Sequence, residues 1–267
     1  MTTSCKSVKS KLIKFRILPQ LFFLLVLLAF SLLSCITSAS KAEEYYAIGN
    51  AYLDLKKYAD AENWFNKAKF HKSTKTASEY NLGRIAYETG RYKEAAEYFY
   101  QIVKADGENI TALKAIAYTY IKLEEPEKAA SYYRIILDLV PESYDEGYNY
   151  ALVLMALGEA EEAEKALVKF NNTESPEALL VLARSQKQQS KVEAADAYSA
   201  SLLKRDDPLV RAEYAVYLAE RGLYAKALEE YGKALGSGKL SEDKKAEIER
   251  AVEQLKTDAQ SGTEAKQ

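Results

Sequence analysis

The sequence predicts an all-α protein built from about six stacked helical hairpins. Small residues recur at a fixed interval of 34 and later 32 residues over most of the chain. Only 5 prolines and 11 glycines interrupt the 267 residues, which suits long helices joined by short turns. The chain is 48% hydrophobic and 28% charged, a balance typical of soluble folded domains. A chain of this length and composition can bury a substantial core.

The first 34 residues have the order of an export signal. Five basic residues and no acidic residue precede an apolar run from Leu21 to Leu33. This run is shorter than the roughly 20 apolar residues that a membrane-spanning helix needs. We therefore expect residues 1–34 to be removed by cleavage, with Cys5 among them.

The end of this segment, Leu32-Leu33-Ser34-Cys35, resembles the lipobox of bacterial lipoproteins. The resemblance implies cleavage before Cys35 and acylation of Cys35, and several acyl chains hold a protein on a membrane stably. Two alternatives remain open, which are ordinary cleavage after Thr37-Ser38-Ala39 and an uncleaved anchor.

A short spacer, residues 35–41, would join the lipid to the folded body. Fully extended, it reaches roughly 20 Å, so the body would work close to the membrane surface. Ile36 stands where some lipoproteins carry the Asp that retains them at the inner membrane. The resemblance thus implies an outer-membrane lipoprotein of the bacterial cell envelope, facing the periplasm.

The body of the chain is an internal repeat. One series of small residues is Ala61, Ala95, Ala129, Ala163, Ala195 and Ala227. A second lies twelve residues earlier in each copy, at Gly49, Gly83, Ala117, Ala151, Ala183 and Ala215. Small residues at fixed points let two antiparallel helices cross closely, while large neighbours fill the space beside the crossing. Each copy is therefore expected to be a helix, a turn and a helix.

Turn and breaker residues support this division. Gly90, Gly158 and Gly222 fall in the turns, and Pro141, Pro176 and Pro208 fall between copies. The pattern of small and aromatic positions over 34 residues resembles the tetratricopeptide repeat, from about Ala42 to Lys239. It implies a right-handed superhelical α-solenoid with copies at 42–75, 76–109, 110–143, 144–175, 176–207 and 208–240.

The fifth copy departs most from the pattern, because Gln186, Gln189 and Ser199 stand where apolar residues are expected. We expect its helix pair to pack more loosely. After the last copy, Ser241 can cap a further helix over residues 241–259 that covers the open end of the stack. Residues 260–267 are polar, and we expect them to be disordered.

The residues needed for common catalytic and metal sites are missing from the body. It has no cysteine and one histidine, His71, so a zinc site or a Cys-His or Ser-His nucleophile lacks its components. Glu142, Asp145 and Glu146 could form a calcium site or a carboxylate pair, but they stand at an expected helix start, where a solvated face is the better interpretation. We expect no metal, no cofactor and no enzymatic activity.

Charge argues against nucleic acid as a partner. The chain has 37 basic residues, and removing the five of the signal leaves 32 against 39 acidic residues, a net charge of −7. Nucleic-acid affinity comes largely from Lys and Arg that neutralise phosphates. We therefore expect a protein or peptide partner.

The resemblance implies a concave groove lined by the first helices of the hairpins. The positions it assigns are Tyr46, Asn50, Tyr80, Asn81, Arg84, Tyr87, Lys114, Tyr118, Lys122, Tyr148, Asn149, Arg184 and Lys187. Tyr and Arg dominate protein-binding hot spots, and Asn can bind a peptide backbone as donor and acceptor. The alternative is that these are ordinary solvent-facing helix residues.

One known use of this groove is a clamp for a peptide's C-terminal carboxylates. Asn50 and Asn81 match two of its positions, but Tyr46, Thr111 and Ala115 replace its basic residues, so we do not expect that ligand. The basic residues of copies two to four instead suggest an apolar partner segment with some acidic residues. The resemblance implies a lipid-anchored scaffold, for instance in an outer-membrane or pilus assembly complex. A soluble periplasmic adaptor is the alternative.

Overall fold

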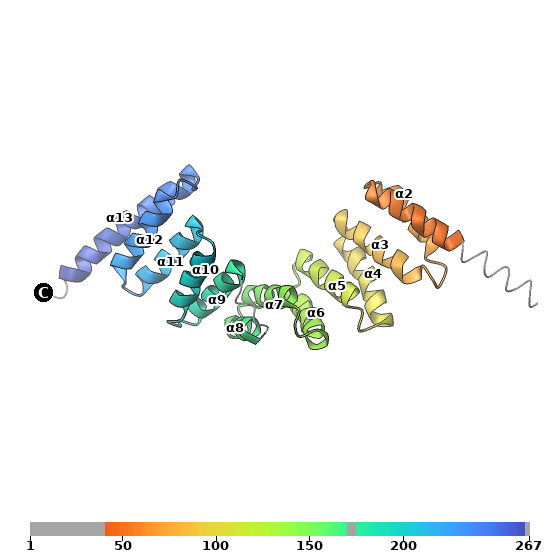
Figure 1. The fold of residues 1–267 in the computed structure, drawn as a ribbon, viewed down its shortest axis with the longest axis horizontal. Coiled ribbons are helices and arrows are strands. Elements are labelled where there is room, and N and C mark those ends of the chain that lie inside the picture. Colours follow the sequence, from red (N-terminus) through yellow and green to blue (C-terminus); the bar gives the residue numbers. More distant parts are fainter. Residues whose placement is uncertain (1–40, 170–174, 265–267) are drawn as a thin grey trace, which may run out of the picture. The chain divides into compact units, whose positions relative to one another are not determined.

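The computed structural model describes residues 41–169 and 175–264, and all regular secondary structure in these ranges is helical (Figure 1). The prediction of an all-α fold is confirmed. The chain divides into two compact units, Met1–Ala112 and Leu113–Gln267. The predicted signal, Cys35 and most of the spacer lie outside the described residues.

Unit 1 contains a helix at residues 41–54. The helices that follow it are α2 (Tyr58–Ala68), α3 (Lys75–Glu88), α4 (Tyr92–Ala105) and the beginning of α5 (Ile110–Lys122). The large core side chains Phe65 and Phe99 come from the second helix of each hairpin and are fully buried. A Cβ atom on Gly49 would lie 2.7 Å from Phe65 Cε1, and one on Gly83 would lie 2.7 Å from Phe99 Cε1. In these two hairpins, glycine therefore stands where a facing phenylalanine ring leaves no room for a side chain.

Unit 2 contains the rest of α5 and eight further described helices. They are α6 (Pro126–Leu139), α7 (Tyr144–Ala156), α8 (Ala160–Lys169), α9 (Pro176–Gln188), α10 (Ala194–Lys204), α11 (Pro208–Glu220), α12 (Tyr224–Gly236) and α13 (Glu242–Glu264). One hydrophobic cluster extends from Leu137 on α6 to Leu255 on α13. Neighbouring helices of the unit thus share a continuous core.

The turn inside each hairpin contains one residue in the left-handed conformation. The predicted glycines Gly90, Gly158 and Gly222 have φ between 72° and 78°. The other three hairpins place Lys56, Glu124 and Ser190 there, with φ between 56° and 60°. In the second hairpin Gly90 N donates to Tyr87 O at 3.0 Å and Arg91 N donates to Ala86 O at 2.8 Å. These bonds close the helix end as a Schellman motif, which needs a residue with positive φ.

The junctions between hairpins use proline and a capping side chain. Pro176 and Pro208 are the first residues of α9 and α11, where the missing N–H costs no hydrogen bond. Ser175 Oγ accepts from Ala178 N at 3.0 Å, and Asp207 Oδ1 accepts from Leu209 N at 2.9 Å. These contacts satisfy backbone donors that a helix start leaves unpaired.

The fifth hairpin corrects two expectations. Its second helix begins at Ala194, and the fully buried pair there is Ala194 and Tyr198, whereas Ala195 and Ser199 are only half-buried. Residues 192–193 form an additional turn after Ser190, so the helix face is displaced by one residue. The apolar position expected at Ser199 is filled by Tyr198.

Gln186 and Gln189, which stand where apolar residues were expected, bond to the preceding hairpin. Gln186 Nε2 and Gln189 Nε2 donate to the Glu164 carboxylate at 3.1 and 2.8 Å. Lys191 Nζ lies 2.6 Å from the same group. The two glutamines therefore replace apolar contacts by hydrogen bonds to the preceding hairpin. The looser packing expected of α9 on α10 is not seen, because Ala183, Ala194 and Tyr198 on these two helices are fully buried.

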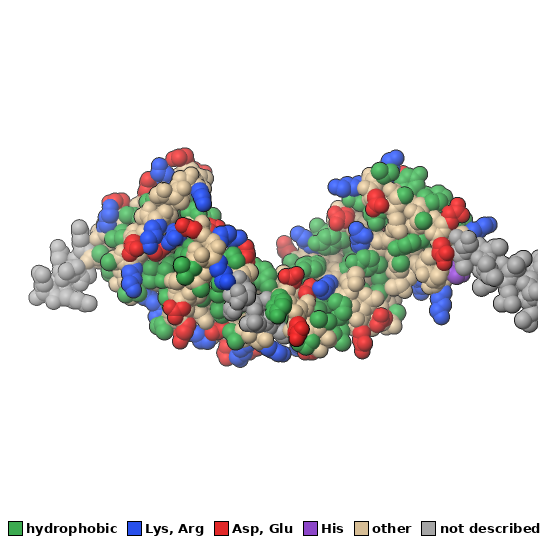
Figure 2. Space-filling model, in the orientation of Figure 1, with side chains coloured by type: hydrophobic (Ala, Val, Ile, Leu, Met, Phe, Trp, Pro, Cys, Tyr) green, Lys and Arg blue, Asp and Glu red, His purple; other side chains and the backbone are tan. Residues whose placement is uncertain are grey.

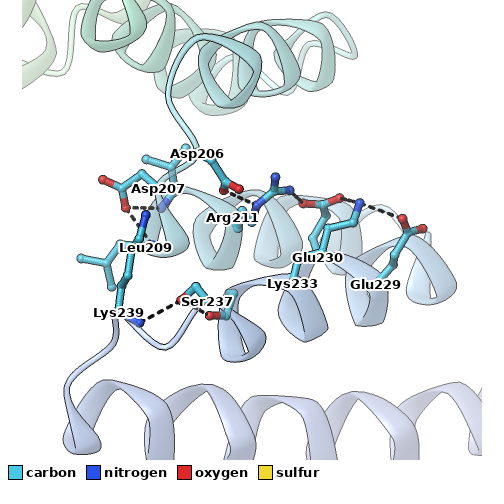
Figure 3. Close-up of polar contacts among 11 residues, drawn as sticks. Asp206, Asp207, Leu209, Arg211, Glu229, Glu230, Lys233, Ser237 and Lys239 are labelled. Carbon is cyan, nitrogen blue, oxygen red and sulfur yellow. Dashed lines mark hydrogen bonds and ion pairs between the residues drawn. The ribbon is translucent and has the colours of Figure 1, made fainter.

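Charged contacts also join the helices of the last hairpin (Figure 3). Arg211 bridges Asp206 and Glu230 at 2.6 Å each, and Lys233 Nζ contacts Glu230 and Glu229 at 2.7 Å each. Glu230 is buried, so two cations compensate a carboxylate with little access to water. This network links α11 to α12.

The final helix, α13, packs on α12 with Ile248 and Leu255 buried. Ser241 Oγ accepts from Lys244 N at 3.4 Å at its start. The helix extends to Glu264, beyond the predicted end at Ala259, which corrects the expectation of disorder for residues 260–264. The segment contains no proline, and Gly262 in a helix costs only about 1 kcal/mol.

Candidate functional site

In unit 1 the expected binding residues are held by contacts with neighbouring side chains. Tyr46 and Tyr80 occupy equivalent places on their first helices and lie against Phe65 and Phe99, with ring centroids 5.7 and 5.5 Å apart. These contacts fix the orientation of both tyrosines. Tyr87 is half-buried and lies edge-on to Tyr92 at 5.4 Å.

Asn81 has a different role from the one expected. It is only 4% exposed, and its Nδ2 donates to Asn50 Oδ1 at 3.0 Å and to Tyr46 Oη at 3.4 Å. Its Oδ1 accepts from Arg84 Nη1 at 3.3 Å. Asn81 therefore positions the half-buried Tyr46 and Asn50 and the exposed Arg84, and its amide is engaged inside the protein instead of being open to a peptide backbone.

In unit 2 the central residue of the expected surface is Tyr118, which is 38% exposed. Asn149 Nδ2 donates to Tyr118 Oη at 2.8 Å, and the Tyr118 ring lies edge-on to the buried Tyr133 at 6.1 Å. Tyr148 is half-buried against the core, and burial raises its pKa. Tyr118 thus presents an aromatic face that is held on two sides.

A polar contact between the first helices of consecutive hairpins recurs at equivalent positions of the repeat, although the residue types differ. Asn50 pairs with Asn81, Tyr118 with Asn149, and Arg184 with Glu213, at separations of 31, 31 and 29 residues. We call these three pairs the first-helix ladder. Because each pair joins one hairpin to the next, the ladder fixes the spacing of neighbouring first helices within each unit.

The Arg184–Glu213 pair is the strongest member of the ladder. Arg184 Nε and Nη2 donate to the two Glu213 oxygens at 2.8 and 2.7 Å, and Tyr198 Oη donates to Oε1 at 2.8 Å. Burial acts to raise the pKa of Glu213, but the bonds from Arg184 and Tyr198 outweigh it and leave that pKa below its ordinary value. Burial and the Glu213 charge raise the pKa of Tyr198.

The acidic cluster at the start of α7 is only partly the solvated face that the sequence suggested. Glu142 and Asp145 are exposed, but Glu146 is 4% exposed. Its carboxylate lies 2.7 Å from Lys114 Nζ and accepts a hydrogen bond from Ser143 Oγ. Burial acts to raise the pKa of Glu146, but these partners outweigh it and lower the pKa.

The ion pairs reduce the positive charge expected on the first helices. Lys114 is paired with Glu146, Arg184 with Glu213, and Lys187 with Glu220 at 3.1 Å. Among the described residues, Arg84 and Lys122 are the expected binding cations without an acidic side chain within 4 Å. Over the face that Figure 2 shows, Lys and Arg side chains are interspersed with Asp and Glu. Recognition of acidic groups on a partner must therefore rest on few residues, chiefly Arg84 and Lys122.

A pocket between α11, α12 and α13 was not predicted. It has a volume of about 340 Å³ and is mostly apolar. Its lining is Leu209, Ala212, Glu213, Val216, Tyr231, Lys244, Glu247, Ile248 and Ala251. Ala212, Glu213 and Val216 stand 132 residues after Tyr80, Asn81 and Arg84, in the same repeat positions. Their positions in the repeat indicate that they belong to the same surface. They were not predicted because none of them is aromatic or basic.

Two further observations bear on function. No group of three or more His, Cys, Asp and Glu side chains suited to a metal ion occurs among the described residues. Within residues 41–169 and 175–264, no helix is both long and apolar enough to cross a membrane.

Antiparallel hairpins that cross at small residues define an α-solenoid of helical repeats. Residues 46–110 and 114–169 match the model of the tetratricopeptide repeat, so the chain contains tetratricopeptide repeats. The chain is similar to a tetratricopeptide repeat protein from Parabacteroides merdae ATCC 43184, with a TM-score of 0.62 and 24% identity over 74% of this chain and 80% of that one. These findings confirm the predicted repeat fold.

Other similar proteins are more distant in structure or cover less of the chain. YrrB, described as a TPR protein with an unusual peptide-binding site, has a TM-score of 0.55 and 18% identity over 62% of this chain and 87% of its own. MamA from Desulfovibrio magneticus RS-1 has a TM-score of 0.56 and 16% identity over 62% and 98%. A Treponema pallidum (strain Nichols) protein named an uncharacterized lipoprotein is 27% identical over 135 residues, which are 50% of this chain and 69% of that protein.

Proposed function

We propose that this protein is a non-catalytic scaffold, lipid-anchored in the bacterial cell envelope, that binds a protein or peptide partner through its first helices. The observation that carries the proposal is the set of tyrosines on these helices, fixed in place by packing and by the first-helix ladder. Tyr80 and Tyr118 present aromatic surface whose rotamers are already restricted, which lowers the entropy cost of binding. The tetratricopeptide fold is generally that of a protein-interaction scaffold and not of an enzyme.

The partner that fits best is an apolar peptide segment with few acidic residues. Arg84 and Lys122 can each pair with a carboxylate, whereas Lys114 and Arg184 are already neutralised. The pocket between α11 and α13 offers an apolar side chain a place to be buried. The likeness to YrrB, whose description names a peptide-binding site, supports a peptide as the ligand.

Binding can be tested by a crosslinking pull-down from native membranes. Truncating an aromatic hot spot costs at least about 2 kcal/mol of binding free energy. The double variant Tyr118→Ala with Arg84→Ala should lose the partner that the wild-type chain captures. Arg84 is exposed, but Tyr118 packs on Tyr133 and accepts a hydrogen bond from Asn149. The melting temperature of the double variant is therefore measured as well, and loss of the partner counts only at a temperature where the variant is folded.

The matched control removes side chains of second helices, Lys128→Ala with Glu162→Ala. Both side chains are 58% exposed and form ion pairs on their own helices or turns. This control should retain the partner. Loss of the partner in the control and its retention in the Tyr118 and Arg84 variant would show that binding uses the second helices instead.

The anchor rests on the lipobox-like Leu32-Leu33-Ser34-Cys35 and on the likeness to the Treponema pallidum lipoprotein. Metabolic labelling with a palmitate analogue tests it. The wild-type chain should incorporate the label and float with membranes, and Cys35→Ser should do neither. Label that persists in Cys35→Ser would contradict lipidation at this residue, and an unlabelled wild-type chain free in the periplasm would favour the soluble adaptor.

A further inference from the structure

The loop that follows α2 carries an unusual surface. From Asn63 to Ser78 the sequence has four lysines and no acidic residue, although the body as a whole is acidic. Phe70, in the middle of this stretch, is 86% exposed. Lys67 Nζ lies 4.0 Å from the centre of the ring of Trp64, the only tryptophan of the chain. We call Trp64, Lys67, Lys69, Phe70 and Lys72 the Phe70 patch.

The Phe70 patch lies at the end of the first hairpin from which the chain leads back toward Cys35. Tyr45, near the start of the first helix, contacts Trp64 near the end of α2, with ring centroids 5.5 Å apart. The two helices are therefore antiparallel, and the loop after Ala68 lies beside the start of the helix at residues 41–54. Only residues 36–40 separate that helix from Cys35, a reach of roughly 20 Å.

The composition of the patch suits an anionic lipid surface. Trp favours the boundary between lipid and water, and Phe side chains of interfacial segments are buried there. Each lysine near an anionic surface strengthens the attraction about fivefold. The acidic side chains on the same elements near this end are Glu43, Glu44, Glu62 and Glu79, of which Glu62 pairs with Arg91 and Glu79 lies 3.9 Å from Lys75. With Lys41, this end has five lysines and four carboxylates, so it keeps a net positive charge.

We propose that the Phe70 patch contacts the anionic surface of the membrane that holds the lipid, with Phe70 inserted among the headgroups. The proposal rests on the lipid anchor proposed above and adds a second attachment point. A lipid chain alone lets the body rotate freely, whereas an anchor and a patch on one hairpin end fix its orientation. The first hairpin then stands on the membrane with its turn, residues 55–57, pointing away.

The test uses the full lipidated chain, reconstituted into vesicles with and without anionic lipid. The body contains no cysteine, so one introduced cysteine in a Cys5→Ser background can carry a polarity-sensitive fluorophore. Phe70→Cys places the fluorophore in the patch. Leu55→Cys is the matched control, because Leu55 is an apolar residue, 67% exposed, at the other end of the same hairpin.

The fluorophore at position 70 should shift its emission to shorter wavelength on anionic vesicles and be quenched by bromine-labelled lipid, and the one at position 55 should do neither. Replacing the four lysines from Lys67 to Lys75 by Gln, or adding salt, should reverse the shift. A chain that floats with vesicles but keeps a water-like emission at position 70 would overturn the patch contact alone. A chain that does not float would overturn the anchor and the contact together. A shift at position 70 that appears only when the partner captured in the pull-down is added to the vesicles would instead assign the patch to protein binding.

Discussion

At the scale of single residues, Glu146 and Lys114 determine how the start of α7 behaves. A buried carboxylate costs free energy unless a cation and hydrogen bonds compensate it. Lys114 supplies the charge at 2.7 Å and Ser143 supplies a hydrogen bond. Lys114 was expected to meet a partner, but its ammonium group is engaged in holding a neighbouring hairpin.

We expect Lys114→Met to destabilise the protein by about 2 kcal/mol at pH 7, because it leaves the Glu146 carboxylate buried without its cation. Urea unfolding would measure this. The double variant Lys114→Met with Glu146→Gln should recover most of the loss, since no uncompensated charge then remains. A single variant as stable as wild type would show that Glu146 is better solvated than its burial indicates.

The pH dependence of this pair has a definite sign. The pKa of Glu146 is lowered from an ordinary value of 4.5, so its stabilising contribution is present above that value and is lost as the pH falls through the folded-state pKa. The penalty of Lys114→Met should therefore begin to shrink as the pH falls through about 4.5, where Glu146 of the unfolded chain takes up its proton, and should be smallest below the lower pKa of the folded state. Unfolding curves at pH 7 and pH 4 would compare the two variants.

At the scale of elements, the close crossing of the two helices in a hairpin depends on glycine in unit 1. Phe99 is buried and lies against Tyr80 at 5.5 Å, so its ring cannot move aside for a Cβ atom on Gly83. The same holds for Gly49 and Phe65. Later copies have alanine at the equivalent position, at Ala117, Ala151, Ala183 and Ala215.

We expect Gly83→Ala to destabilise unit 1 by about 1 to 3 kcal/mol through overpacking, although alanine favours helix. Gly232 in α12 is the matched control, since a Cβ there would meet nothing within 4 Å. Gly232→Ala should stabilise the protein by about 0.5 to 1 kcal/mol. Thermal unfolding of both variants checks the pair, and stabilisation in both cases would contradict the crossing geometry.

The sequence predicted the fold well because its signals repeat, and it predicted the site less well because contacts between copies do not follow from residue types. Glycine marked three of the hairpin turns, but Lys56, Glu124 and Ser190 adopt the same left-handed conformation without that signal. The one-residue displacement of the buried face of α10 was not predicted either, because a repeat of fixed spacing gives no sign of the extra turn at residues 192–193. Asn81 and Glu146 were expected at the surface, and only the neighbouring hairpin shows that they are buried.

At the scale of the whole molecule, α13 closes the apolar end of unit 2. Ile248 and Leu255 are buried, and Ile248 lines the pocket together with Leu209 and Tyr231. A stack of hairpins exposes apolar surface at an end that nothing covers. The helix is therefore part of the fold of unit 2 and also forms one wall of the candidate binding pocket.

We expect truncation after Ser241 to lower the free energy of unfolding by about 3 kcal/mol or more, because the burial of Ile248 and Leu255 is lost. The truncated chain should also self-associate in size-exclusion chromatography. Truncation after Ala259 is the control and should change stability by less than about 0.5 kcal/mol. Equal behaviour of both truncations would mean that α13 does not cover the end of the stack.

The fixed length of the first half of every hairpin has a consequence for how this protein can evolve. Seven residues separate the first small position from the left-handed turn residue in all six copies, as from Gly83 to Gly90. From that turn residue to the next small position the chain takes 27 residues three times and then 25 twice. The difference in length thus falls on the second helices and junctions. The second helices and junctions can therefore change in length during evolution while the binding residues of the first helices keep their spacing. Partner recognition and chain length can then change independently.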